Sequence, residues 1–187
     1  MKSQSMFRSL SGLVALALVL AAGTPTGFAQ TADSEHISNL LKQAKSHAVL
    51  AEVDAAKLES YTRSKASWQL HAGQLQLIRE HVNELGKLNK QLRDSRTEGS
   101  PWQQMAVDQV DARLREMADL LTVTINHLND NPTNVHMQAY QEYAKANREL
   151  TSRIAEMLDD FVDYDEAKSK AESLEQKLEL PVVASSK

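Results

Sequence analysis

The sequence predicts an all-α protein: an antiparallel up-down-up-down four-helix bundle with a C-terminal helical extension. Aromatic residues make up only 5% of the chain, while the good helix formers Ala, Leu, Gln, Glu and Lys abound. Apolar side chains recur at alternating three- and four-residue steps in four segments of about 28–31 residues each. Segments of similar length joined by short turns favour antiparallel neighbours in one bundle, which we place at residues 30–162.

The start of the chain predicts an export signal. Lys2 and Arg8 supply positive charge, residues 10–22 are apolar and uncharged, and Ala29 ends a stretch that suits a signal peptidase. The apolar run is shorter than the roughly 18–20 residues that cross a bilayer, so a retained membrane anchor is the alternative we favour less. We expect residues 1–29 to be a cleaved signal peptide and the mature protein to be periplasmic or secreted from a bacterium.

Composition narrows the classes of function. The chain has no cysteine, which excludes disulfides, thiolate metal sites and covalent attachment of haem. Cleavage after Ala29 removes two of the 21 basic residues and none of the 25 acidic ones, which leaves a net charge of −6. This acidic balance argues against nucleic acid or an anionic membrane surface as a partner.

The first half of the mature chain predicts two helices. The first spans residues 33–62, with Asp33 or Ser34 as its cap and several alanines on its apolar stripe. The second begins at Trp68 and carries two rows of stripe residues seven apart, until residues 94–99 form a polar turn. Its stripe residues are Trp68, His71, Leu75, Ile78, Val82, Leu85, Asn89 and Leu92.

The second half predicts two more helices and a tail. Ser100 caps the third helix, Pro101 takes its first position and Gln103 completes a capping box. Asn131 and Pro132 are expected to open the fourth helix in the same way. Residues 163–180 form a helical tail that continues the fourth helix, folds back or pairs with a second molecule, and residues 181–187 are expected to be disordered.

Histidines are the first candidates for chemistry. In an up-down bundle His71, His127 and His136 lie near the same end, where they can bind zinc, copper or another divalent ion, with Glu52 or Glu59 as a further ligand. The alternative is that they are boundary and helix-end residues, with His127 favoured there by the helix dipole. No Glu-x-x-His pair, the usual mark of a metal site in a bundle, accompanies them.

Four other groups of residues are weaker candidates. His36 and Met157 are the ligands that non-covalent haem would take, as in small four-helix periplasmic cytochromes, although Met157 also suits a plain core position. The five carboxylates between Asp159 and Glu166 lack the glycine of a calcium loop and suit a solvated helix face. Trp68 and Trp102 suit the ends of the core, with the indole N–H reaching a loop carbonyl. Tyr61, Tyr140 and Tyr143 either pack in the core or line a small pocket beside the histidines.

Several runs carry a resemblance to a known group of proteins. They resemble predicted secreted bacterial helical-bundle proteins, and the resemblance implies export and a shared fold but no activity or site residues. The runs are Ser67–Ala72, Ile78–Asn83, Ser100–Gln104 and Gln141–Tyr143.

The sequence contains no serine elbow, thiol, phosphate loop or framed pair of acids, so we do not expect an enzyme. We expect a non-enzymatic binding or structural role in the cell envelope, without a cofactor. The expected partner is another envelope protein or a second copy bound through the tail. The alternative is a bundle that binds metal or haem.

Overall fold

The structure is a computed structural model that describes residues 32–64 and 66–178. No strand occurs in these two ranges, so the all-α prediction is confirmed for them. The predicted signal peptide, residues 1–29, and the predicted disordered C-terminus, residues 181–187, lie outside the described residues. The elements are α1 (Glu35–Thr62), α2 (Trp68–Asp94), the short 3-10 helix η1 (Arg96–Glu98), α3 (Pro101–Asp130) and α4 (Gln138–Lys177).

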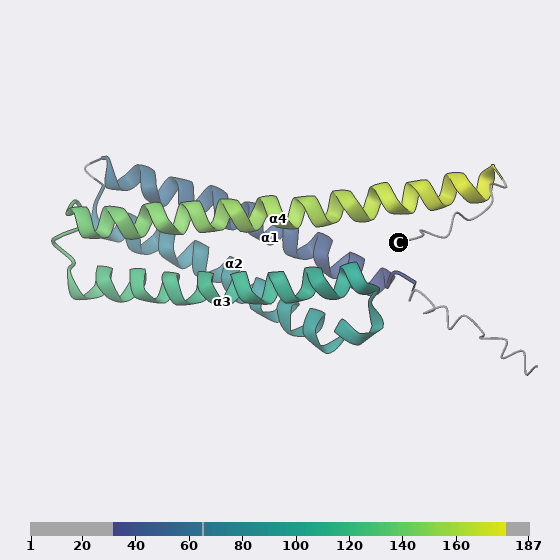
Figure 1. Cartoon of the computed structure of the whole chain (residues 1–187). Coiled ribbons are helices and arrows are strands. Elements are labelled where there is room, and N and C mark those ends of the chain that lie inside the picture. Colours follow the sequence, from purple (N-terminus) through teal and green to yellow (C-terminus); the bar gives the residue numbers. More distant parts are fainter. Residues whose placement is uncertain (1–31, 65, 179–187) are drawn as a thin grey trace, which may run out of the picture.

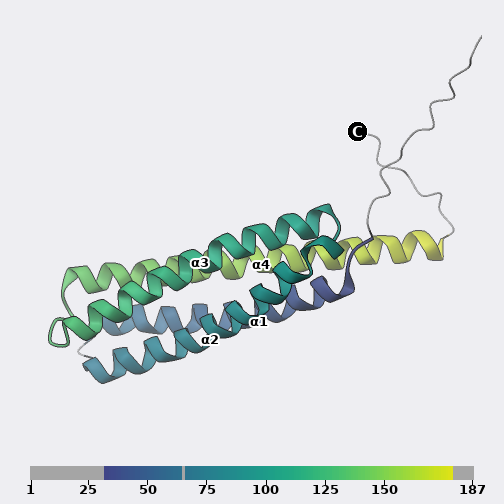
Figure 2. The same ribbon diagram turned by 90° about the horizontal axis from the view of Figure 1, so that it is seen from below.

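The four α-helices pack alongside one another (Figures 1 and 2). Helix α1 contacts α2 and α4, and α3 contacts the same two helices.

Each tryptophan joins the start of one helix to another part of the chain through a hydrogen bond. The Trp68 indole Nε1 donates a hydrogen bond to the Leu128 carbonyl at 3.1 Å, and the Trp102 indole Nε1 donates to Asp33 Oδ1 at 2.8 Å. The tryptophans therefore close the core where α2 and α3 begin, as predicted, but their partners are a helix carbonyl and a carboxylate and not the expected loop carbonyls.

The predicted apolar stripes form the core. The four stripe alanines of α1, residues 44, 48, 51 and 55, are at most 1% exposed, so the neighbouring helices can approach α1 closely. Burial of one leucine or isoleucine side chain contributes roughly 1.5–3 kcal/mol. All four helices supply the largest fully buried side chains: Ile37, Leu41, Leu58, Leu75, Ile78, Leu85, Leu92, Met117, Leu128, Tyr140, Leu150 and Ile154.

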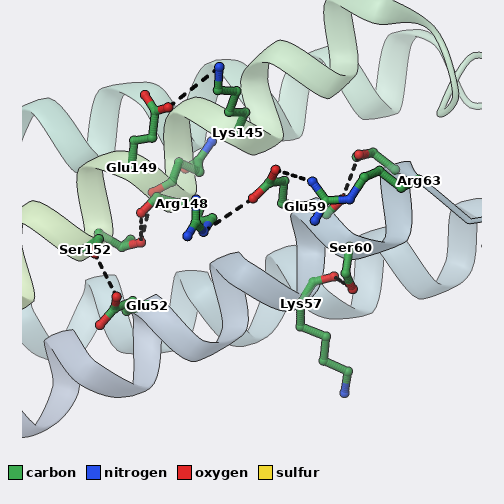
Figure 3. A network of polar contacts seen from close by, with 12 residues as sticks. Glu52, Lys57, Glu59, Ser60, Arg63, Lys145, Arg148, Glu149 and Ser152 are labelled. Carbon is green, nitrogen blue, oxygen red and sulfur yellow. Dashed lines mark hydrogen bonds and ion pairs between the residues drawn. The ribbon is translucent and has the colours of Figure 1, made fainter.

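Polar contacts line the seam between α1 and α4 (Figure 3). The Ser152 hydroxyl donates to the Glu52 carboxylate at 2.8 Å. Further along, Arg148 Nε lies 3.4 Å from Glu59 Oε2, while Arg63 donates to Glu59 Oε1 at 2.5 Å. Residue numbers rise along α1 as they fall along α4 at these contacts, which sets the register between the two helices.

The sequence located the starts of α1, α2 and α3 correctly, and two of these starts have the predicted caps. Ser34 is the N-cap of α1, and its side chain accepts a hydrogen bond from the Ile37 N–H. At α3 the predicted capping box between Ser100 and Gln103 is present, with the Ser100 N–H donating to Gln103 Oε1 at 3.2 Å, and Pro101 takes the first helical position. These caps satisfy backbone N–H groups that a helix leaves without partners in its first turn.

The predicted start of the fourth helix at Asn131 and Pro132 is wrong. Asn131 instead caps the C-terminus of α3, where its backbone N–H and its side-chain amide both donate to the His127 carbonyl. A residue in that role cannot also cap the next helix. Two turns follow, in which Val135 is buried, and α4 begins only at Gln138.

Helix α4 is longer than the other three. It runs without a break for 40 residues, against 28 for α1, 27 for α2 and 30 for α3. In Figure 1 its yellow end continues past the neighbouring ends of α1 and α3. Within residues 32–64 and 66–178, no helix is both long and apolar enough to span a membrane.

Candidate functional site

The structure brings two of the three predicted histidines onto one tyrosine. The His71 and Tyr140 rings meet edge to face with centroids 5.2 Å apart, and His127 stacks on Tyr140 at 6.2 Å. Tyr61 meets His71 from α1 at 5.8 Å. His136 is exposed in the connection before α4, close enough for its charge to affect His71.

His71 and Tyr140 are buried as neutral groups. His71 is 0% exposed and Tyr140 is 1% exposed. Burial lowers the pKa of His71, and the charge of His136 lowers it further. Burial likewise raises the pKa of Tyr140 far above its ordinary value. Among the described residues, neither ring nitrogen of His71 has a hydrogen-bond partner, and the Tyr140 hydroxyl has none either. Protonation of His71 would therefore place an unpaired charge in the core.

These imidazoles are arranged as packed rings and not as converging ligands. Among residues 32–64 and 66–178, no three His, Asp or Glu side chains are grouped to hold a metal ion. The two carboxylates considered as further ligands, Glu52 and Glu59, bind Ser152 and two arginines in the seam. A metal site at His71, His127 and His136 stays a prediction from sequence.

The structure does not bring His36 and Met157 together. His36 is exposed at the start of α1, whereas Met157 packs against the core from α4. Lys45 of α1 pairs with Asp159, so Met157 lies at the level of residues just after Lys45. At 1.5 Å per residue this level is about 15 Å along α1 from His36, too far for two ligands of one haem iron.

The acidic cluster near the end of the bundle is largely used in pairing α4 with α1. Asp159 pairs with Lys45, and Glu166 lies 3.3 Å from Lys42 Nζ. Asp165 is buried and accepts a hydrogen bond from the Ser38 hydroxyl at 2.9 Å. The exposed Asp160 and Asp163 point to the solvated face that the sequence suggests.

A second pair of histidines, which the sequence reading did not single out, lies between α1 and α2. The Nδ1 atoms of His47 and His81 are 3.4 Å apart, and the two rings are tilted by 46°. Both side chains are partly buried. In the neutral pair, one Nδ1–H donates a hydrogen bond to the lone pair of the other Nδ1.

The Asp54 carboxylate faces the other ring nitrogen of His81, Nε2. Its Oδ2 lies 3.5 Å from Nε2 of His81, and its Oδ1 accepts a hydrogen bond from the Gln74 side-chain amide at 2.7 Å. Because Gln74 is buried, with 3% of it exposed, its position is fixed, and its hydrogen bond holds the Asp54 carboxylate in place. A carboxylate facing Nε2 favours the proton on that nitrogen, which leaves a lone pair on Nδ1 of His81, directed at His47.

An open depression on the α1–α2 surface adjoins the histidine pair. It is lined by His47, Glu80, His81, Asn83, Glu84 and Lys87. Lys87 Nζ lies 2.6 Å from Glu84 Oε1. The hydrogen bond from Lys87 is the largest cause of the lowered pKa of Glu84. The Glu84 carboxylate and solvent therefore lie beside the two imidazoles.

The sequence did hold a signal for this pair. His47 and His81 lie equally far from residue 64, which is in the connection between the first two helices, and so do Asp54 and Gln74. In a helical hairpin such equidistant residues face each other. Periodicity along single helices cannot find this relationship, because it depends on the register between two helices.

Comparison with known proteins places the chain in no family. No protein-family model matches it, and neither a curated protein nor a solved structure matches it.

Proposed function

We propose that the chain is an exported, non-enzymatic structural protein of the cell envelope that associates with a second copy of itself through the end of α4. In this proposal the helices form an antiparallel up-down-up-down bundle, and the end of α4 is a C-terminal extension of it. The observation that carries the proposal is the exposure of apolar side chains there. Leu174 is 47% exposed and Leu178 is 61% exposed, on a segment in which every residue from 169 to 178 is exposed.

The base of this segment is held firmly by the rest of the molecule. Lys168 Nζ forms an ion pair with Asp33, and the Tyr164 ring meets the Trp102 ring at 5.0 Å. Burial raises the pKa of Asp33, but the hydrogen bonds from Lys168 and Trp102 and the charge of Lys168 outweigh it and leave this pKa below its ordinary value. The ion pair therefore persists at neutral pH, and α4 leaves the bundle in a defined direction.

The segment suits an antiparallel pairing with its own copy. Ala167, Ala171, Leu174 and Leu178 follow one another at helical spacing. When Ala171 faces Leu174 of the second copy, Ala167 faces Leu178, so each small side chain meets a large one. Residues 169–178 carry two lysines and two glutamates, and this neutral balance avoids repulsion between the copies.

The test compares the molar mass of residues 30–187 with that of a Leu174→Glu, Leu178→Glu variant, by size-exclusion chromatography with light scattering. We expect a dimer for the natural sequence and a monomer for the variant. Leu70→Glu is the matched control, because Leu70 is 52% exposed on α2, and it should stay dimeric. A monomeric natural chain, or a variant that stays dimeric with unchanged helix content, overturns the proposal. If the natural chain is a monomer, the binding partner of this segment would be a different envelope protein.

A further inference from the structure

We propose that His47 and His81 form a binding site for a borderline divalent cation such as zinc, in which both Nδ1 atoms are ligands. The site would join α1 to α2 and is separate from the end of α4. It is also distinct from the three histidines that the sequence suggests as a metal site.

The distance between the two nitrogens supports the proposal. Zinc binds imidazole nitrogen at about 2.0–2.1 Å in a tetrahedral arrangement, which sets two such nitrogens about 3.3–3.4 Å apart. The Nδ1 atoms of His47 and His81 are 3.4 Å apart. A cation can therefore replace the shared proton between the rings while both side chains keep nearly their present positions.

The surroundings of His81 match those of a metal-binding histidine. Such histidines commonly present their other ring nitrogen to a carboxylate, which selects the tautomer and makes the ligand nitrogen more basic. Asp54 faces Nε2 of His81 at 3.5 Å and is held by Gln74. In the neutral pair His47 carries its single ring proton on Nδ1, so metal binding requires that this proton move, through solvent, to Nε2 of the same ring.

The open depression provides the remaining ligands. Since no group of three ligands is in place among the described residues, the site begins with two protein ligands and water. Glu84 lies beside His47 and is held at present by Lys87. It can become a third ligand by leaving that lysine. Imidazole and carboxylate together suit zinc, copper and nickel better than calcium or magnesium.

The first test is a zinc titration of the tag-free, chelator-treated mature chain, residues 30–187, followed by competition with a chromophoric zinc indicator. We expect one zinc ion per chain. His47→Ala and His81→Ala should each weaken binding by more than about 100-fold, and Asp54→Asn by about 10- to 100-fold, the usual effect of losing a carboxylate behind a metal-binding histidine. His136→Ala, in the predicted histidine group, should bind as the natural chain does.

A second readout separates ligation from a general effect on folding. Long-range ¹H–¹⁵N NMR of the histidine rings in the unmodified chain should show zinc shifting the Nδ1 signals of His47 and His81 and leaving those of His71 and His127 in place. Absence of zinc binding overturns the proposal. So does zinc binding that survives both His47→Ala and His81→Ala, or zinc that shifts the ring signals of other histidines instead.

Discussion

The side-chain amide of Gln103 and the backbone of Ser34 are joined by two hydrogen bonds. The Ser34 N–H donates to Gln103 Oε1 at 2.7 Å, and Gln103 Nε2 donates to the Ser34 carbonyl at 3.0 Å. The same Oε1 accepts from the Ser100 N–H at 3.2 Å within the capping box of α3. One fully buried amide thus holds the starts of α1 and α3 together, although 69 residues separate Gln103 from Ser34.

Gln103→Ala should therefore destabilise the protein by about 1–3 kcal/mol, because it leaves buried backbone groups without partners. Urea unfolding followed by circular dichroism measures the change. The control is Gln109→Ala on the exposed face of the same helix, which should stay within about 0.5 kcal/mol of the natural chain. Equal stability of the two variants would show that the amide contacts contribute little.

Substitution of two glycines by alanine should change the stability of the fold in opposite directions. A Cβ at Gly86, in the interior of α2, meets no atom within 4 Å, so Gly86→Ala should stabilise by about 1 kcal/mol through its helix propensity. A Cβ at Gly99 would lie 2.7 Å from Ile37 Cδ1 and 3.0 Å from Gln103 Cβ. Gly99→Ala should destabilise by about 1–3 kcal/mol through overpacking. Thermal melts of both variants measure these shifts, and a shift of the same sign for both contradicts the described packing.

Sequence reasoning succeeded where the signal is local. The capping box at Ser100 depends on residues three apart, so the start of α3 was predicted correctly. It failed at Asn131, because asparagine suits either end of a helix and only the packing of α3 decides between them. The two hydrogen bonds between Gln103 and Ser34 could not be predicted from the sequence either. It depends on how two distant helix starts meet.

The histidines show the same limit. The helical spacing put His71 on the apolar stripe of the second helix, where it was expected to be a metal ligand or a boundary residue, and the structure buries it completely. The ring contacts to Tyr140 and Tyr61 required the packing between helices. The pair His47 and His81 required the register of one helical hairpin.

Stability should fall in acid partly because of His71. Burial and the nearby His136 lower the pKa of His71 in the folded state, so the unfolded chain binds the proton more readily. This contribution to stability is complete above the ordinary histidine pKa of about 6.5 and is lost as the pH falls below it, by at most about 1.4 kcal/mol per pH unit. The groups that face His71 are Tyr61, Tyr140 and His136, and none is a carboxylate that could offset the charge.

Urea unfolding at pH 7.5, 6.5 and 5.5 tests this pH dependence. His71→Leu should lose less stability between the first and the last pH than the natural chain does. The exposed His36→Ala serves as the control and should follow the natural chain. Parallel pH profiles for the natural chain and His71→Leu would contradict a lowered pKa at His71.

Zinc should stabilise the fold if His47 and His81 bind it, because the ion would link α1 to α2 only in the folded chain. At a free zinc concentration about 100 times the dissociation constant, the expected gain is about 2.7 kcal/mol. Thermal melts with and without zinc should show a higher melting temperature for the natural chain and none of this increase for His81→Ala. An equal increase in both proteins would assign the effect to zinc bound elsewhere.

The most direct test of the proposed structural role is sedimentation equilibrium of the mature chain, residues 30–187, over a range of protein concentrations. Self-association through the end of α4 predicts an average mass that rises from one chain to two as the concentration increases, with a curve shifted to higher concentration by Leu174→Glu. A mass of one chain at every concentration would contradict it.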